Sequence, residues 1–88
     1  MSDLEYDLLD ELYFIQSFQE LSGKLQWNHQ MLRDTLTKLF QKDWIRCFAT
    51  PEDELFGEEI DLEIQYHTYF YQASKLGLMA HNTTDQDG

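Results

Sequence analysis

The sequence is poor in cysteine, proline and basic residues, and these shortages exclude several classes of protein. Its 88 residues include one cysteine, one proline and three histidines. Because a disulfide needs a second cysteine and a structural zinc site takes several thiolates, the lone Cys47 excludes both. Six lysines and arginines stand against 17 aspartates and glutamates. The resulting net charge of -11 excludes a generic polyanion binder.

The sequence also lacks a long hydrophobic run. No apolar stretch approaches the roughly 20 residues that a membrane-spanning helix requires. Residues 1–10 carry acids where a signal peptide would carry lysine or arginine. We therefore expect a soluble cytoplasmic protein in a reducing compartment, with no membrane partner.

The apolar content is sufficient for one folded domain. The chain is 42% hydrophobic and 15% aromatic, whereas disorder requires high charge together with few apolar residues. A chain of this length holds one core, so we expect a single domain over residues 1–81. Residues 82–88 are polar and end in glycine, and we expect them to form a disordered tail.

Three helices are predicted before residue 44. Ser2 and Glu5 have the spacing of a capping box, so the first helix should start there. A short second helix is expected over residues 17–25, and a third after Asn28, a candidate N-cap. Apolar residues recur every three or four positions, as one buried helix face requires. They are Leu4, Leu8, Leu12 and Ile15, then Phe18, Leu21 and Leu25, then Leu32, Leu36, Leu39 and Phe40.

The periodicity changes after residue 44. Residues 44–49 favour a strand and are followed by Pro51, which cannot donate a backbone hydrogen bond. Apolar residues then occupy every second position from Ile60 to Phe70, which predicts a strand over 60–71, with a helix through 54–71 as the alternative. The acidic stretch 51–59 between these strands should be a solvated hairpin loop, and a short helix over 73–81 should follow. The predicted fold class is α+β.

The middle of the chain carries a specific pattern of residue classes. Within residues 20–46 it consists of Leu21 and Leu25 in a short helix, Trp27 in a turn, Asn28 at a cap, the leucines of the third helix, and Trp44-Ile45-Arg46. This pattern resembles the core of the winged helix-turn-helix domain found in bacterial repressors of the multiple-antibiotic-resistance and arsenic-repressor kinds. Residues 71–77 are similar, more weakly, to the stretch with which such domains enter their last helix.

The resemblance implies a specific architecture and a possible role in regulating transcription. It implies three helices followed by a two-stranded β wing and a short C-terminal helix. It also implies a DNA-reading helix over residues 28–42 and a homodimer paired through terminal helices. Gln26 and Asp43 stand where the family usually has glycine, so both turns must be made by residues that enter the left-handed region less readily.

The first hypothesis for function is binding of double-stranded DNA. Residues 24–48 carry five basic residues against two acidic ones, and this stretch coincides with the third helix. Polar residues off its buried face could contact bases and phosphates. They are Asn28, His29, Gln30, Arg33, Thr37 and Lys38. A solvated helix face without such a role is an equally simple interpretation of the same residues.

The alternative hypothesis is binding of a basic protein partner without DNA binding. Seven acids lie between Glu52 and Glu63, where a wing beside DNA would carry lysine or arginine. Aromatic residues are enriched in interfaces, and the predicted strand places two tyrosines on its outward face. This hypothesis assigns Glu58, Glu59, Tyr69 and Tyr71 to the partner surface.

No catalytic, metal or cofactor site is predicted. His29, His67 and His81 are too far apart in the predicted fold to form one metal site. The acidic stretch lacks the spacing of a calcium-binding loop. Cys47 is expected to be a small buried residue, because a reactive thiolate needs a cationic neighbour. We therefore expect a binding module that is not an enzyme.

Overall fold

The computed structural model describes the backbone of residues 1–87 and the side chains of residues 1–83. The helices are α1 (Asp3–Glu11), α2 (Phe18–Leu25), α3 (His29–Gln41) and α4 (Lys75–Asp87). The strands are β1 (Gln16–Ser17), β2 (Ile45–Thr50), β3 (Asp53–Leu55) and β4 (Phe70–Ala73). Two short 3-10 helices, η1 (Gly57–Glu59) and η2 (Tyr66–Thr68), lie between β3 and β4. The predicted α+β class is confirmed.

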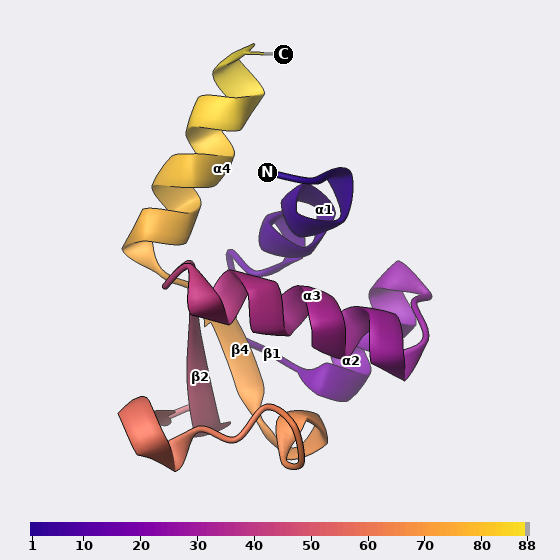
Figure 1. Ribbon diagram of the computed structural model, residues 1–88, viewed down its shortest axis with the longest axis vertical. Coiled ribbons are helices and arrows are strands. Elements are labelled where there is room, and N and C mark those ends of the chain that lie inside the picture. The colour runs from indigo at the N-terminus through magenta and orange to yellow at the C-terminus, as the bar shows by residue number, and fades with distance from the viewer. Residues whose placement is uncertain (88) are drawn as a thin grey trace.

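The strands form one antiparallel sheet in the order β1-β4-β2-β3. At its centre β2 pairs with β4, from Ile45 opposite Ala73 to Phe48 opposite Phe70. In Figure 1, α3 runs across the molecule at the upper ends of β2 and β4, with α1 and α4 above it and the β3–β4 connection below the strands. The sheet therefore has β1 and β3 as its edges, and the connection from β3 to β4 forms one end of the molecule.

Side-chain caps determine where the first three helices begin. Ser2 and Glu5 form the predicted capping box, with the Glu5 amide donating to the Ser2 hydroxyl at 3.2 Å and the Ser2 amide donating to the Glu5 carboxylate at 3.0 Å. Ser17 and Glu20 repeat this arrangement at α2. The Asn28 side chain accepts from the Met31 amide at 2.8 Å, as a cap of α3 should. All three predicted starts are confirmed.

Both turns that flank α3 use the left-handed backbone region without glycine. Gln26 has a φ of 57° and Asp43 a φ of 61°. After α3, the Asp43 amide donates to the Phe40 carbonyl and the Trp44 amide to the Leu39 carbonyl, each at 3.0 Å, which is the Schellman arrangement. Gln26 and Asp43 therefore adopt the conformation expected from their positions in the sequence.

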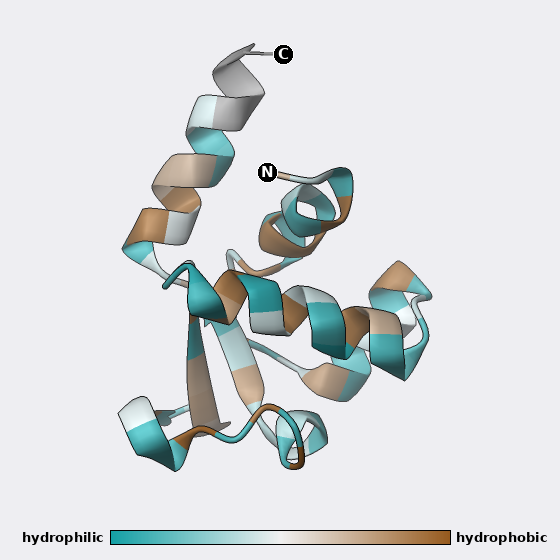
Figure 2. Cartoon of the chain, in the orientation of Figure 1, coloured by the Kyte–Doolittle hydropathy of each residue, from teal (hydrophilic) through white to brown (hydrophobic). Residues whose placement is uncertain are grey.

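The core lies between the first three helices and the sheet. The fully buried side chains include two leucines of α1 and Leu12 directly after it, three leucines of α3 and, from the sheet, Cys47 and Tyr71. Figure 2 shows hydrophobic residues recurring at intervals along α1, α2 and α3, as the predicted amphipathic pattern requires. Leu4 departs from that pattern, because it is 41% exposed at the start of α1. No helix within residues 1–87 combines the length and apolar character needed to cross a bilayer.

The strand predicted over residues 60–71 is wrong. Only Phe70–Ala73 forms a strand, and the chain before it is an irregular connection that includes η2. The Asp61 carboxylate accepts from the amides of Glu63 and Ile64 at 3.1 and 3.2 Å, so a local turn and not a strand ladder satisfies these two amides. The alternation of apolar residues also fails to match burial, because Ile64 is 64% exposed.

The prediction of a hairpin loop over residues 51–59 is also wrong. This range contains β3, which pairs with β2 so that Asp53 lies opposite Thr50 and Leu55 opposite Cys47. The Arg46 guanidinium donates to the Glu54 carboxylate at 2.5 and 3.1 Å across the pair. Acidic residues are uncommon in strands, so residue preferences alone did not predict β3. The ion pair between Arg46 and Glu54 stabilises its pairing with β2.

The last helix is longer than predicted. Ser74 caps α4, because its hydroxyl accepts from the Gly77 amide at 3.1 Å and its amide donates to the Trp44 carbonyl at 2.9 Å. The helix was expected to end at His81, but its backbone continues to Asp87. Residues 82–87, expected as a tail, therefore belong to α4 in the structure. Gly88, the end of that expected tail, lies outside the described residues.

Candidate functional site

The outer face of α3 carries the residues predicted to contact DNA. Several of them already have partners within the protein. Asn28 caps the helix, and the Thr37 hydroxyl donates to the Arg33 carbonyl at 2.9 Å. The His29 ring meets the Phe18 ring edge-on at a centroid distance of 5.2 Å. Gln30 and Lys38 are exposed.

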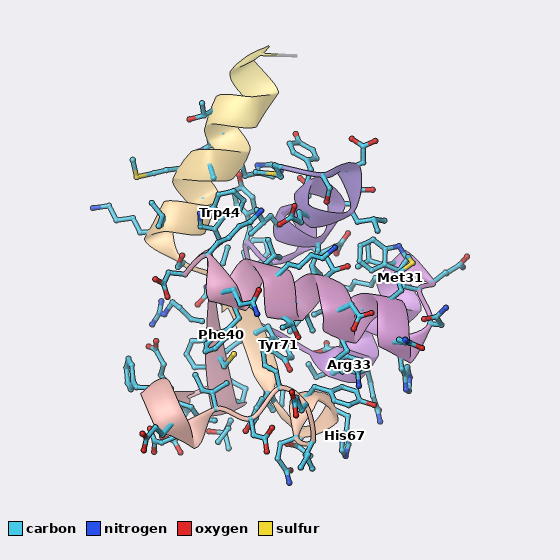
Figure 3. The ribbon with its side chains drawn as sticks, in the orientation of Figure 1. Met31, Arg33, Phe40, Trp44, His67 and Tyr71 are labelled. Atoms are coloured by element: carbon cyan, nitrogen blue, oxygen red, sulfur yellow. The ribbon has the colours of Figure 1, made fainter. Side chains whose placement is uncertain are left out.

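A hollow of about 600 Å³ lies between α3 and the connection that precedes η2. Arg33, Thr37 and Lys38 line it from the helix, so the structure brings three of the predicted DNA contacts together. Glu63 and Ile64 line the opposite wall. The Arg33 guanidinium lies 5.7 Å from the centre of the Tyr66 ring, on the side of α3 that faces η2 (Figure 3). An acid therefore stands beside the basic residues of this face.

The five basic residues of the stretch 24–46 do not share one surface. Lys42, at the end of α3, donates to the Glu5 carboxylate of α1 at 2.6 Å, and its ammonium lies 4.6 Å from the centre of the Trp44 ring. Arg46 is paired with Glu54 in the sheet. Two of the five charges thus meet acids on two different elements, away from the hollow beside Arg33.

These two ion pairs also shift the pKa of their carboxylates. Burial would by itself raise the pKa of Glu5, but hydrogen bonds from Lys42 and Ser2 outweigh it and lower that pKa from 4.5 to about 2. The hydrogen bond from Arg46 lowers the pKa of Glu54. Both acids are therefore ionised at neutral pH, and their charge compensates the basic partner.

Comparison of the chain with protein-family models, curated proteins and solved structures found no match. The function must therefore be inferred from the arrangement of the residues themselves.

The tyrosines assigned to the partner surface are buried, so that assignment is wrong. Tyr69 is 7% exposed and Tyr71 is fully buried. The Tyr71 hydroxyl donates to the Tyr66 carbonyl at 2.6 Å, and the Tyr69 hydroxyl accepts from the Asp61 amide at 3.0 Å. Both rings hold the β3–β4 connection against the core. Their outward placement was deduced from a strand over 60–71 that does not form.

The acids between Glu52 and Glu63 fall into two groups. Glu54, Glu59 and Asp61 have partners: Arg46, the Phe56 amide and the amides after Asp61. The side chains of the other four, within the part of the chain that the structure describes, form neither hydrogen bonds nor ion pairs. They are Glu52, Asp53, Glu58 and Glu63. Of the two glutamates predicted to contact a partner, Glu58 is therefore available, whereas Glu59 is engaged in capping η1.

A smaller hollow of about 240 Å³ lies between the end of α3, the β2–β3 hairpin and η1. Its lining is largely apolar and includes Phe40, Ile45, Cys47, Leu55 and Ile60. In Figure 3, Phe40 lies between the end of α3 and the η1 segment. Phe56 also lines the hollow and is 65% exposed. Asp43, Arg46 and Glu54 border it, and because Arg46 and Glu54 compensate each other, Asp43 supplies the net negative charge of the hollow.

Sequence reasoning missed Phe40 and Phe56 as members of a site. Phe40 was assigned to the buried side of α3, but it is only partly buried. Phe56, in the acidic stretch, was not considered. A phenylalanine among five acids, in a segment expected to be solvated, was the signal that could have identified this site. The residues that line the hollow with Phe56 could not be named, because the path of the chain between β3 and β4 could not be predicted.

Cys47 has the predicted structural role. It is fully buried, and burial, with a smaller effect of the Glu54 charge, raises the pKa of its thiol to about 12. The thiol is therefore protonated and is a poor nucleophile at neutral pH. Among the described residues, no group of three or more histidines, cysteines or acids is placed to hold a metal ion.

Proposed function

We propose that this protein is a non-enzymatic winged-helix module that binds a basic protein partner. One observation carries the proposal: the basic residues of α3 and β2 are divided among separate surfaces, whereas Asp43 lines an apolar hollow at the β2–β3 hairpin and the exposed acids Asp53 and Glu58 lie on the neighbouring β3 and η1. Apolar contact flanked by charge is typical of protein interfaces. A cytoplasmic location agrees with this role.

The order of the elements supports the winged-helix part of the proposal. A helix, a very short strand and two helices precede a hairpin, and β1 lies next to the last strand, β4. In this interpretation α3 is the equivalent of the recognition helix and the β2–β4 pair is the wing. The strand β3 is then an addition at the outer edge of the sheet.

Electrostatics argue against DNA as the main ligand. Affinity for DNA depends on several lysines or arginines that neutralise phosphates together. Here Lys42 and Arg46 form ion pairs with Glu5 and Glu54. The two other basic residues of α3, Arg33 and Lys38, line one hollow with Glu63. A duplex that approached α3 would bring its phosphates close to the acids of the connection, and repulsion would oppose docking.

Two binding measurements test the proposal. Labelled random duplex DNA at low salt should give no binding curve, and random peptides displayed on phage and selected on the protein should be enriched in lysine and arginine. Glu58→Lys should weaken binding of the selected peptides about tenfold, because it places a like charge at the site. Asp7→Lys, an equal charge change on exposed α1, is the matched control. Selection of peptides without basic residues would contradict the proposal.

DNA binding by α3 is the second candidate, because Arg33, Thr37 and Lys38 share one exposed hollow. This function requires a duplex affinity that falls steeply with salt and is lost when Arg33 and Lys38 are both changed to alanine. Retention of the same affinity in that double variant would remove α3 as the DNA-reading element.

We also propose a homodimer, which the resemblance implied, through α4. Leu76 and Met79 are 50% and 57% exposed on this helix and line a hollow of about 360 Å³ with Met1 and Trp44. Burial of these side chains against a second copy would remove apolar surface from water. Sedimentation equilibrium should show a dimer that Met79→Lys converts to monomer, and a wild-type monomer at high protein concentration would contradict this pairing.

A further inference from the structure

We infer that the hollow at the β2–β3 hairpin seats one apolar side chain of an extended, basic segment of the partner, and that this segment pairs with the free edge of β3. The inference rests on the proposed function and specifies its ligand. It follows from three features of the site: the lining of the hollow, the position of β3 and the charge around both.

The hollow has the size and lining of a pocket for one side chain. Its volume of about 240 Å³ lies below the roughly 300–1,000 Å³ of sites for small-molecule ligands. Ile45 and Cys47 are buried beneath it, and Phe40, Leu55 and Ile60 are partly buried around it. A leucine, isoleucine or phenylalanine from a partner would lose its water contacts against these five side chains.

The strand β3 offers the backbone for pairing. Within residues 1–87 it pairs with β2 alone and is the last strand of the sheet, so one row of its backbone groups faces outward. Leu55 of this strand lines the hollow, and Phe56 follows it at the mouth. A segment added to β3 would therefore place alternate side chains beside the hollow, as in other cases of strand addition.

The charge around the hollow selects a basic occupant. Asp43, Asp53 and Glu58 are exposed acids of this region, and Glu52 lies in the turn before β3. The one basic residue that lines the hollow, Arg46, is compensated by Glu54. A second copy of this chain that paired through its own β3 would bring the same acids against each other and be repelled, whereas lysine or arginine on either side of the seated residue would be attracted.

The test uses the peptides selected on the full chain and two matched variants. Phe56→Ser removes the exposed ring at the mouth of the hollow, and Ile64→Ser removes a side chain of similar exposure from the neighbouring hollow. We expect selected peptides to contain one bulky apolar residue between basic residues. Binding by fluorescence polarisation should fall about tenfold with Phe56→Ser and stay unchanged with Ile64→Ser.

A second measurement tests strand pairing without relying on a variant. Addition of the selected peptide should slow hydrogen exchange of backbone amides in residues 53–55 and leave those of α3 unchanged. Basic peptides that bind equally well to Phe56→Ser and leave these amides unprotected would overturn the inference while the proposed function stands. A selection that yields no basic peptides would overturn the proposed function and the inference with it.

Discussion

At the scale of single residues, Glu5 joins two helices that are far apart in the sequence. One carboxylate oxygen accepts from the Ser2 amide at the start of α1, and the other accepts from Lys42 at the end of α3. Glu5 is 5% exposed, and a buried carboxylate is tolerated only when such partners replace water. The capping role could be predicted from the S-x-x-E spacing, whereas the ion pair with Lys42 could not.

The Glu5–Lys42 pair should make stability depend on pH in a defined range. The unfolded chain binds a proton at Glu5 near pH 4.5 and the folded chain near pH 2, so the contribution is complete above pH 4.5 and is lost as pH falls towards 2. Lys42→Met should lower the free energy of unfolding by about 1–3 kcal/mol at neutral pH. Urea unfolding at several pH values should show this difference shrinking below pH 4.5, and a constant difference would contradict the role of the pair.

Gly77 permits the close approach of α4 to the end of α3. A Cβ atom at this position would lie 2.0 Å from the Trp44 carbonyl oxygen. Gly77→Ala should therefore lower the free energy of unfolding by about 1–3 kcal/mol, as overpacking does. Gly23→Ala is the control, because a Cβ added there would have nothing within 4 Å. Alanine in place of glycine should stabilise helix α2 by about 0.5–1 kcal/mol. Equal effects of the two substitutions in urea unfolding would contradict this account.

At the scale of elements, the connection from β3 to β4 determines both hollows. It contributes Glu63 and Ile64 to one hollow, and Phe56, Gly57 and Ile60 to the other. Hydrogen bonds of Asp61 and of two buried tyrosines hold it in place although it has little regular structure. Both hollows are therefore shaped by a segment that has little regular secondary structure.

Asp61 should hold this connection through its acceptor oxygen and not through its charge. Asp61→Ala removes the acceptor for the Glu63 and Ile64 amides and should cost about 0.5–1.5 kcal/mol of stability. Hydrogen exchange of these two amides should also become faster. Asp61→Asn keeps a side-chain oxygen and should behave like the wild type. If both variants lost the same stability, the carboxylate charge would be the cause instead.

The elements predicted correctly are those whose signals are local. Ser2, Ser17 and Asn28 each bond to an amide three residues ahead, so the starts of α1, α2 and α3 could be read from short patterns. The strand over 60–71 was mispredicted because the alternation of apolar residues does not correspond to burial, since Leu62 is buried whereas Ile64 is exposed. The strand β3 was missed because Arg46, eight positions before Glu54, stabilises it across the sheet.

At the scale of the whole molecule, the distribution of charge in space differs from its distribution along the chain. Five basic residues lie close together in the stretch 24–46, yet Lys42 turns to α1 and Arg46 to β3. The sequence therefore showed which segments carry the acids and bases, but not that Glu54 joins a strand or that the bases are divided between separate surfaces. The apolar hollow could not be predicted either, since its walls come from α3, β2, β3 and the connection.

The central claim is that the β2–β3 hairpin, and not α3, is the binding surface. Its most direct test is an NMR titration of the labelled protein, first with a selected basic peptide and then with duplex DNA. We predict that the peptide shifts the amide signals of residues 52–58 and that DNA at the same concentration shifts none. Shifts of α3 residues 30–38 on addition of DNA, with residues 52–58 unchanged by the peptide, would contradict the claim.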